Sequence, residues 1–335
     1  MSMVKKCAAG FVIALVGLTF LRANDLPQVP QEIRELMRDR KYDHVVSAID
    51  NAFTDQETKP RDPEYLPYLK GRAQHLGGKY REALETFAQL ELDYPAGKWL
   101  RRARFGQASA LLKLGDFEAA EHIYEQEVRF LLSTERKHEI ASIYLEFADA
   151  YFNPPAKDRK PDYQKALNFY KQALAVGPNG ERRVDVEYRV ARCHQELGQF
   201  AEAAAAYQSF LKIHPQSQFD IDVRFELGKT QLAQKQNVEA RRTWKDLLSS
   251  PRVAEKPERA AEAAYEIAHT YGLPAPSSAE DLELGVAAAE KFIANYPEHK
   301  LAPKAAFEIA QGYVAQNRQD EAIRTLQKLI GNPHF

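Results

Sequence analysis

Residues 184–220 read VDVEYRVARCHQELGQFAEAAAAYQSFLKIHPQSQFD, and this stretch predicts the fold. Apolar residues recur three and four positions apart from Tyr188 and again from Ala203, a spacing that predicts two amphipathic helices. A short turn around Gly198 separates the two helices, and Pro215 follows the second one. Because Ala203 has a small side chain, it lets the two helix backbones approach closely where they cross.

The same unit recurs along the chain. The counterparts of Ala203 are Ala83, Ala120, Ala166, Ala240 and Ala322. The first four steps are 37, 46, 37 and 37 residues long, and the last gap of 82 residues contains two steps if Gly285 fills the missing position. A period near 37 residues predicts a stacked array in which neighbouring helix pairs bury each other's apolar faces.

These residues resemble the tetratricopeptide repeat family. That family has a small residue in its first helix (helix A), an aromatic near the turn, an alanine in its second helix (helix B), and then an aromatic and a proline. One copy here reads Ala191, Phe200, Ala203, Tyr207 and Pro215, whereas the copy with Gly285 is degenerate. The resemblance implies an all-α fold, a right-handed solenoid of antiparallel helix pairs. About seven repeats are expected over residues 64–335, at 64–97, 98–136, 137–180, 181–217, 218–254, 255–298 and 299–335.

Short sequence segments at the end of helix B suggest a subtype of this repeat family. Leu92-Asp93-Tyr94-Pro95 and Ala294-Asn295-Tyr296-Pro297 look like repeats of bacterial cell-envelope proteins, such as the Tol-Pal coordinator and the outer-membrane assembly lipoproteins. The resemblance implies a protein-binding scaffold in the cell envelope. The alternative is a recruitment or spacer array at the front of a larger secreted multidomain protein.

The N-terminus also indicates export. Lys5 and Lys6 precede an apolar run over residues 7–21, and Ala23 follows it. This pattern predicts a signal peptide over residues 1–23, cleaved near Ala23, and hence a periplasmic or secreted protein. The run is shorter than the roughly 20 residues that a spanning helix needs, although an uncleaved anchor is the alternative. We expect a tether at residues 24–30, and a divergent helical hairpin plus loop at 31–63.

Composition and motifs argue against several functions. The chain has 46 Lys and Arg against 47 Asp and Glu, which does not indicate a nucleic-acid binder. After removal of the signal peptide only Cys193 remains, so no internal disulfide is expected and a packed thiol is predicted. We expect contact with a membrane only by association.

Two motifs resemble catalytic or nucleotide sites, and each departs from its pattern. Leu227-Gly228-Lys229-Thr230 contains the Gly-Lys-Thr of a phosphate-binding loop, but Val223 stands where its first glycine belongs and the segment is predicted to be helical. His138-Glu139 opens like a zinc-protease helix, with Ser142 in place of the second histidine. We therefore expect no catalytic residue, cofactor or metal, and no enzyme. An envelope hydrolase subunit is the alternative from another class.

Two columns of helix A residues are candidates for binding a protein or extended peptide. The first column lies three residues before the small residue of each helix A and is mostly aromatic: Tyr68, Phe105, Leu145, Tyr188, Phe225, Tyr265 and Phe307. The second column lies one residue after the small residue, and its residue type varies from repeat to repeat: Arg72, Ser109, Asp149, Arg192, Lys229, His269 and Gln311. We call it the variable column. The resemblance implies that helix A lines the concave surface, where aromatic anchors beside cations would suit an acidic partner segment. The alternative is that the aromatics pack between helices. The asparagine of the family's clamp for chaperone C-termini is absent from the variable column.

Two further features bear on partners. Proline-rich loops at 153–162 and 272–279 lengthen two steps of the array, either as a binding edge or as tolerated insertions. The last helix B carries Ile323, Leu326 and Ile330 without a visible polar cap. That stripe predicts continuation of the array, self-association or docking onto a partner at this helix.

Overall fold

The computed structural model describes residues 29–54, 62–131, 137–155, 159–177 and 180–331. These residues form sixteen α-helices and one short 3-10 helix, and no strand occurs among them. The all-α prediction is confirmed. The predicted signal peptide and most of the tether fall within residues 1–28, outside the described residues.

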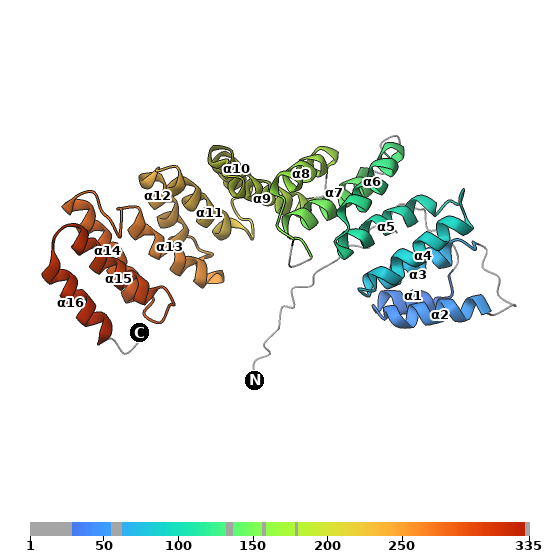
Figure 1. Cartoon of the computed structure of the whole chain (residues 1–335), viewed down its shortest axis with the longest axis horizontal. Coiled ribbons are helices and arrows are strands. Elements are labelled where there is room, and N and C mark those ends of the chain that lie inside the picture. The colour runs from blue at the N-terminus through green and yellow to red at the C-terminus, as the bar shows by residue number, and fades with distance from the viewer. Residues whose placement is uncertain (1–28, 55–61, 132–136, 156–158, 178–179, 332–335) are drawn as a thin grey trace. The chain divides into compact units, whose positions relative to one another are not determined.

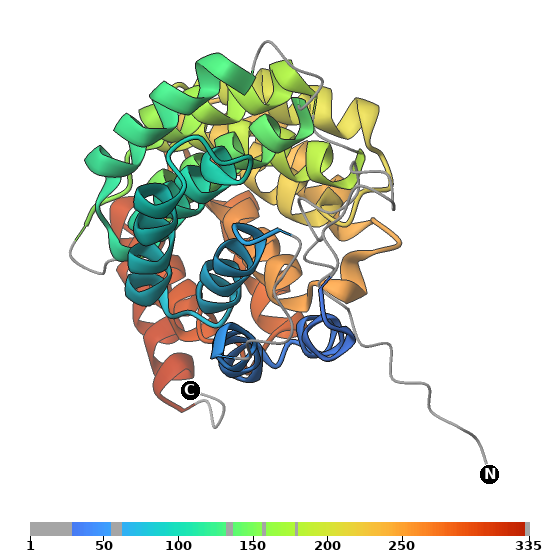
Figure 2. The ribbon, with the colours of Figure 1, turned by 90° about the vertical axis from the view of Figure 1, so that its right-hand side faces the viewer.

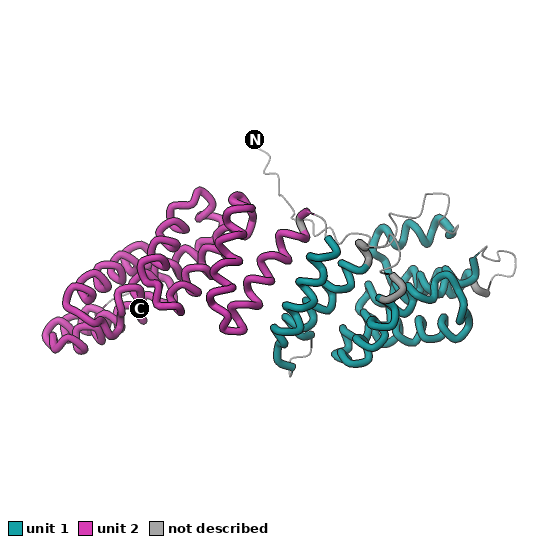
Figure 3. Tube along the Cα trace, turned by 90° about the horizontal axis from the view of Figure 1, so that it is seen from above, with its two compact units in different colours: residues 1–179 teal, residues 180–335 magenta. Residues whose placement is uncertain are grey.

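The helices divide into two units, residues 1–179 and residues 180–335 (Figure 3). Unit 1 contains α1 (Gln31–Arg38), α2 (Tyr42–Thr54), α3 (Tyr65–Leu76), α4 (Tyr80–Asp93), α5 (Leu100–Leu114), α6 (Phe117–Leu131), α7 (Lys137–Phe152) and α8 (Tyr163–Val176). Unit 2 contains α9 (Gly180–Glu196), α10 (Phe200–Ile213), α11 (Asp220–Ala233), α12 (Asn237–Leu248), the 3-10 helix Val253–Glu255, α13 (Pro257–His269), α14 (Ala279–Asn295), α15 (Ala302–Ala315) and α16 (Gln319–Ile330).

Consecutive helices within each unit pack side by side as antiparallel pairs (Figures 1 and 2). In every pair from α3 onward, the odd-numbered helix is helix A and the even-numbered helix is helix B. Helix A also contacts helix A of the next pair, as α3 contacts α5 and α11 contacts α13. Helix A residues of neighbouring repeats therefore share one face within a unit.

Several of the turns inside the helix pairs contain a residue with a left-handed backbone. Gly115 and Gly198 occupy this place with φ of 87° and 71°. Lys235 and Asn317 occupy the same place in later repeats with φ of 61° and 59°. Only glycine adopts this conformation without a steric cost, which is roughly 1–2 kcal/mol for other residues. The later turns therefore keep the geometry at some cost in stability.

A small residue of helix A lies against a large ring of helix B. A β-carbon added at Gly71 would lie 2.7 Å from the ring of Phe87, and one added at Gly228 would collide with Trp244. Trp244 is fully buried, and its Nε1 donates a hydrogen bond to the carbonyl oxygen of Phe225 at 3.2 Å. The close helix crossing that the small residues predicted is present in these pairs.

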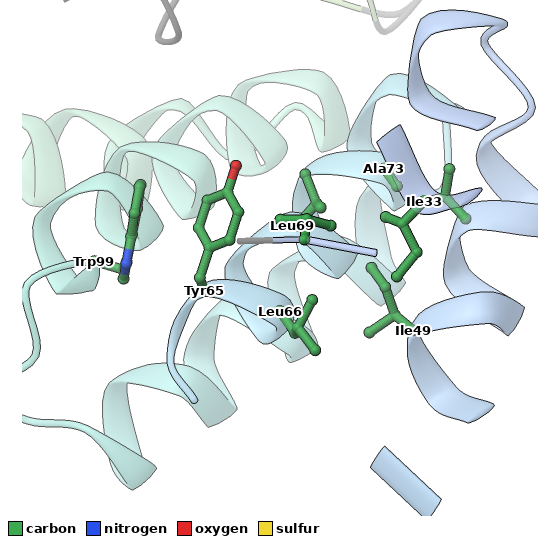
Figure 4. Packing of buried hydrophobic residues seen from close by; sticks show 9 residues of the cluster. Ile33, Ile49, Tyr65, Leu66, Leu69, Ala73 and Trp99 are labelled. Carbon is green, nitrogen blue, oxygen red and sulfur yellow. The ribbon is translucent and has the colours of Figure 1, made fainter. Parts of the chain in front are cut away.

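The first helix pair, α1 and α2, packs on α3 through one apolar cluster (Figure 4). Ile33 and Ile49 are buried there beside Leu66 and Leu69 of α3. At the far end of the cluster, Tyr65 lies beside Trp99, with ring centroids 4.5 Å apart. This cluster therefore joins the N-terminal hairpin to the residues that precede α5.

The first proline-rich loop contacts the helices around it. Arg159 lies over the ring of Phe117, with its guanidinium carbon 3.6 Å from the ring centroid. Asp162 caps α8, because its side chain accepts a hydrogen bond from the backbone N–H of Lys165 at 2.9 Å. Residues 156–158 of this loop lie outside the described residues.

The second proline-rich loop forms part of the core of its repeat. Leu273 is only 5% exposed, and β-carbons added at Gly285 and Gly312 would lie 2.9 and 2.6 Å from its side chain. The side-chain amide of Gln316 donates to the carbonyl oxygen of Pro276 at 2.8 Å. The side chain of Leu273 thus occupies the space beside Gly285, which explains why glycine stands where other repeats have alanine.

Leu273→Ala and Gly285→Ala test this packing in urea denaturation. We expect Leu273→Ala to lower the free energy of unfolding by about 2–5 kcal/mol because it leaves a cavity. Gly285→Ala is expected to cost about 1–3 kcal/mol through overpacking. The double variant should lose less than the sum, since the new methyl group enters the space vacated by the leucine. Strictly additive losses, or no loss for Leu273→Ala, would place this loop outside the core.

Candidate functional site

The aromatic column lies mainly between helices. Phe225 and Tyr265 are 4% and 3% exposed, whereas Tyr68, Phe105, Tyr188 and Leu145 are half-buried. Tyr188 stacks on Phe219 with ring centroids 5.1 Å apart. Packing between neighbouring helices therefore accounts for most of this column, and the half-buried members also present an edge to solvent.

The last helix pair differs from the others. Phe307, at the position of the buried Tyr265, is 48% exposed. Ile323 and Ile330 of α16 are 52% and 86% exposed, whereas Leu248, which matches Ile330 in an earlier repeat, is partly buried against its neighbours. Two residues of the apolar stripe predicted for this helix, Ile323 and Ile330, are therefore exposed, whereas the third, Leu326, is half-buried.

Most residues of the variable column make hydrogen bonds within the chain. Ser109 Oγ lies 2.9 Å from His75 Nε2, and Asp149 accepts a hydrogen bond from the hydroxyl of Tyr170 at 2.5 Å. Arg192 donates to Glu196 at 3.2 Å. Lys229 Nζ lies 3.4 Å from a carboxylate oxygen of Glu226 in the same helix. Gln311 is exposed on α15. The column is thus partly exposed, and in unit 2 its cations have acidic neighbours.

Sequence analysis did not identify a third column, which carries carboxylates. Glu226, Glu266 and Glu308 stand two residues before the small position of α11, α13 and α15. Glu226 and Glu308 are only 5% and 8% exposed. The repeated acid at this position was visible in the sequence, but its burial depends on the contact between successive helices A.

These carboxylates join neighbouring repeats of unit 2. Gln195 of α9 donates to Glu226 at 2.8 Å. A guanidinium nitrogen of Arg259 of α13 lies 4.0 Å from Glu226, and the Nε of the same arginine lies 3.4 Å from Asp222 of α11. Buried carboxylates are costly unless they are paired and hydrogen-bonded, so these partners from α9 and α13 stabilise the buried Glu226 of α11.

His269 is a member of the variable column that lies between two carboxylates. Its two ring nitrogens lie 2.9 Å from Glu266 and 3.1 Å from Glu308. Burial alone would lower the pKa of His269, but its hydrogen bonds to these two carboxylates raise the pKa to about 9. Burial likewise opposes ionisation of Glu308, yet hydrogen bonds from His269 and Tyr265 hold the pKa of this carboxyl below its usual value. An imidazolium therefore links α13 to α15 at neutral pH.

The Gly-Lys-Thr sequence lies in a helix, as the sequence predicted. Gly228 lies inside α11, and Trp244 occupies the space beside it, so the Gly-Lys-Thr sequence forms no loop. Within the described ranges, no group of three or more His, Cys, Asp or Glu side chains could hold a metal ion. Cys193 is completely buried. None of the helices in the described part of the chain combines the length and apolar character needed to cross a bilayer.

The pH dependence of stability tests the charge on His269. The folded-state pKa lies above the ordinary value of about 6.5. Its contribution to stability is therefore complete below that value and is lost as the pH rises through about 9. We expect the difference in unfolding free energy between the wild type and His269→Gln to be largest near pH ~6, and to shrink as the pH rises from ~6.5 to about 9. A difference that stays constant across this range in urea denaturation would mean that His269 is neutral.

Comparisons with known proteins agree with the repeat pattern. Family models described as tetratricopeptide repeat match residues 68–131, 161–220 and 304–333. No curated protein matches the chain.

Among solved structures, the chain is similar to the C-terminal part of a tetratricopeptide repeat-containing protein from Cytophaga hutchinsonii. The TM-score is 0.61 at 14% identity, over 82% of this chain and 98% of that one. A signal transduction ATPase with a tetratricopeptide repeat sensor, from Pyrococcus horikoshii, gives a TM-score of 0.53 at 16% identity, over 89% of this chain and 45% of that one. The chain therefore carries tetratricopeptide repeats, and its helix pairs have the fold of tetratricopeptide-repeat solenoids.

Proposed function

We propose that this chain is an exported scaffold that holds an extended segment of a partner protein along its helix A face, in the bacterial cell envelope. Tetratricopeptide repeats generally mediate binding of protein partners, which supports the scaffold role. The assignment of binding to the helix A face, and of the protein to the bacterial cell envelope, is our proposal.

The alignment of helix A positions within each unit is the observation that carries the proposal. Helices α3 and α5 contact each other, as do α5 and α7 in unit 1, and α11 and α13 in unit 2. The residues of the variable column therefore follow one another along a face, and they are half-buried or exposed rather than buried. A face that presents a different polar group at each repeat suits recognition of an extended segment.

The envelope location rests on the sequence. Lys5 and Lys6, the apolar run over residues 7–21 and the small Ala23 form a secretory signal pattern. The phrases Leu92-Asp93-Tyr94-Pro95 and Ala294-Asn295-Tyr296-Pro297 resemble repeats of envelope proteins. A recruitment array within a larger secreted protein is compatible with the same observations.

The exposed apolar stripe of α16 would supply a second contact surface. Ile323 and Ile330 are exposed on that helix. Exposed apolar groups of this kind favour association with another protein surface. A further helix pair or a second copy of the chain would cover them.

Photo-crosslinking in bacterial cells tests the proposal. A benzophenone amino acid is placed at Ser109 or Gln311 on the helix A face, or at Glu125 or Glu202, which are exposed on helix B. We expect crosslinked protein species in the periplasmic fraction from the helix A positions and not from the helix B positions. The mass of the recovered chain should correspond to cleavage near Ala23.

Leu15→Arg provides the export control, because a charge in the apolar run blocks recognition of a signal peptide. This variant should keep its N-terminus and lose the periplasmic crosslinks. Crosslinks confined to helix B would refute the helix A face as the binding surface. Recovery of the intact chain from the cytoplasm would refute export.

A further inference from the structure

Three linkers that lead from a helix B to the next helix A share one backbone conformation. The residue that ends helix B in each case is Tyr94, His214 or Tyr296, with φ of −134°, −124° and −134° and ψ of 65°, 57° and 56°. A proline follows each of them. Three positions further on, a backbone N–H donates to the carbonyl oxygen of that end residue, at 2.9, 3.1 and 3.1 Å. Side chains at matching positions of these linkers can therefore be compared directly.

We call the residue three positions after the end of helix B the linker residue, which is Gly97, Ser217 or His299. In the first linker, a β-carbon added at Gly97 would collide with the carboxylate of Glu64, which precedes α3. In the third, the imidazole of His299 lies edge-on to Phe292 of α14, with ring centroids 5.7 Å apart, and its side chain is only 10% exposed. In both, a side chain occupies the space beside the linker.

The second linker, between α10 and α11, has a cavity at the corresponding place. Val184 of α9 stands where the first repeat has Glu64, seven residues before the small residue of helix A. Ser217 is much smaller than the histidine of the third linker. A cavity of about 360 Å³ remains, lined by Val184, His214, Pro215, Gln216 and Ser217.

Hydrogen bonds to the neighbouring elements fix the walls of this cavity. The Nε2 of His214 lies 2.7 Å from a carboxylate oxygen of Glu187 on α9. Arg252, from the following repeat, donates to the carbonyl oxygens of Gln216 and Ser217, both at 2.8 Å. The cavity is thus largely formed before a ligand arrives, as is usual for binding sites.

The lining combines apolar surface with one polar group. Val184 and Pro215 supply the apolar surface. The hydroxyl oxygen of Ser217 accepts a hydrogen bond from the backbone N–H of Phe219 at 3.2 Å. No residue in the described ranges accepts a hydrogen bond from this hydroxyl, so its proton is available to an acceptor in the cavity. A neutral imidazole ring carries such an acceptor nitrogen.

We propose that this cavity binds the neutral imidazole ring of a histidine side chain that the protein partner presents. The ring would take the place that the imidazole of His299 takes in the third linker, pack on Val184 and Pro215, and accept a hydrogen bond from Ser217. The site lies at a linker and not in the columns of helix A. Its assignment to a partner rests on the proposed scaffold function.

Saturation-transfer difference NMR on the purified chain tests the binding of the ring. The probe is N-acetylhistidine methylamide at pH ~8, where the imidazole is neutral because its ordinary pKa is about 6.5. We expect a roughly millimolar Kd, since one side chain supplies few contacts. Ser217→His should raise the Kd on the order of tenfold or more, because the new imidazole occupies the cavity as His299 does in its own linker.

The matched control is Gln218→His, which adds the same ring at the exposed neighbouring position. Its Kd should equal that of the wild type. An equal loss of affinity in the two variants, or no binding to the wild type, would overturn the proposal.

A second substitution tests the comparison between the linkers. His299→Ser in the Ser217→His background removes the imidazole from the third linker, and binding of the probe should return. If the double variant folds and still does not bind, the space at His299 does not correspond to the cavity, and the argument for an imidazole fails.

Ser217→Ala separates recognition of imidazole from general packing of a ring. This variant should weaken binding of the histidine probe several-fold and leave binding of N-acetylphenylalanine methylamide unchanged, because only the histidine accepts a hydrogen bond from the hydroxyl. If the wild type binds the two probes equally, and Ser217→Ala affects neither, the cavity holds any ring and the assignment to histidine is wrong.

A benzophenone amino acid at the exposed Gln216 identifies the source of the ring in cells. We expect a crosslink to the partner that Ser109 or Gln311 captures, and its loss in the Ser217→His background. Crosslinks at Ser109 or Gln311 without one at Gln216 would overturn the assignment to the partner and leave the scaffold function standing. Absence of crosslinks at all three positions would contradict the scaffold function itself, and the assignment to a partner would fail with it.

Discussion

Close contact between a small residue of helix A and a ring of helix B underlies the arrangement of the repeats. Gly71 against Phe87 and Gly228 against Trp244 leave no room for a β-carbon. Trp244 is completely enclosed, as are Tyr170 and Tyr207 on other helices B. Because the contact fixes how each pair crosses, it also fixes which side of helix A remains for the next repeat and for a partner.

The ion pairs of helix A differ between the two units. In unit 2, buried carboxylates such as Glu226 and Glu308 pair with cations and with hydrogen-bond donors from the neighbouring repeat. In unit 1, cations of α3 and α5 pair with acids of other helices, as Lys70 does with Asp50 and Arg104 with Glu91. Both arrangements join one helix to another.

Helix pairing could be predicted from the sequence because small, aromatic and proline residues recur at the period of the repeat. The roles of single residues were harder to predict. Gly285 looked degenerate, and only the structure shows Leu273 packed beside it. The acid at Glu308 recurs in the sequence, but its ion pair with His269 joins residues 39 positions apart and depends on packing. The binding columns stay predictions, since partial exposure alone does not identify a ligand.

The stability of Gly228→Ala tests the central contact most directly. Helix propensity alone would make this substitution stabilising by roughly 1 kcal/mol, whereas overpacking against Trp244 is expected to cost about 1–3 kcal/mol or more. Gly180→Ala, in a helix with open space beside the glycine, serves as the control and should be neutral or stabilising. We predict that urea denaturation will show a net loss of stability for Gly228→Ala only. An equal or higher free energy of unfolding for Gly228→Ala would contradict the close contact on which this account rests.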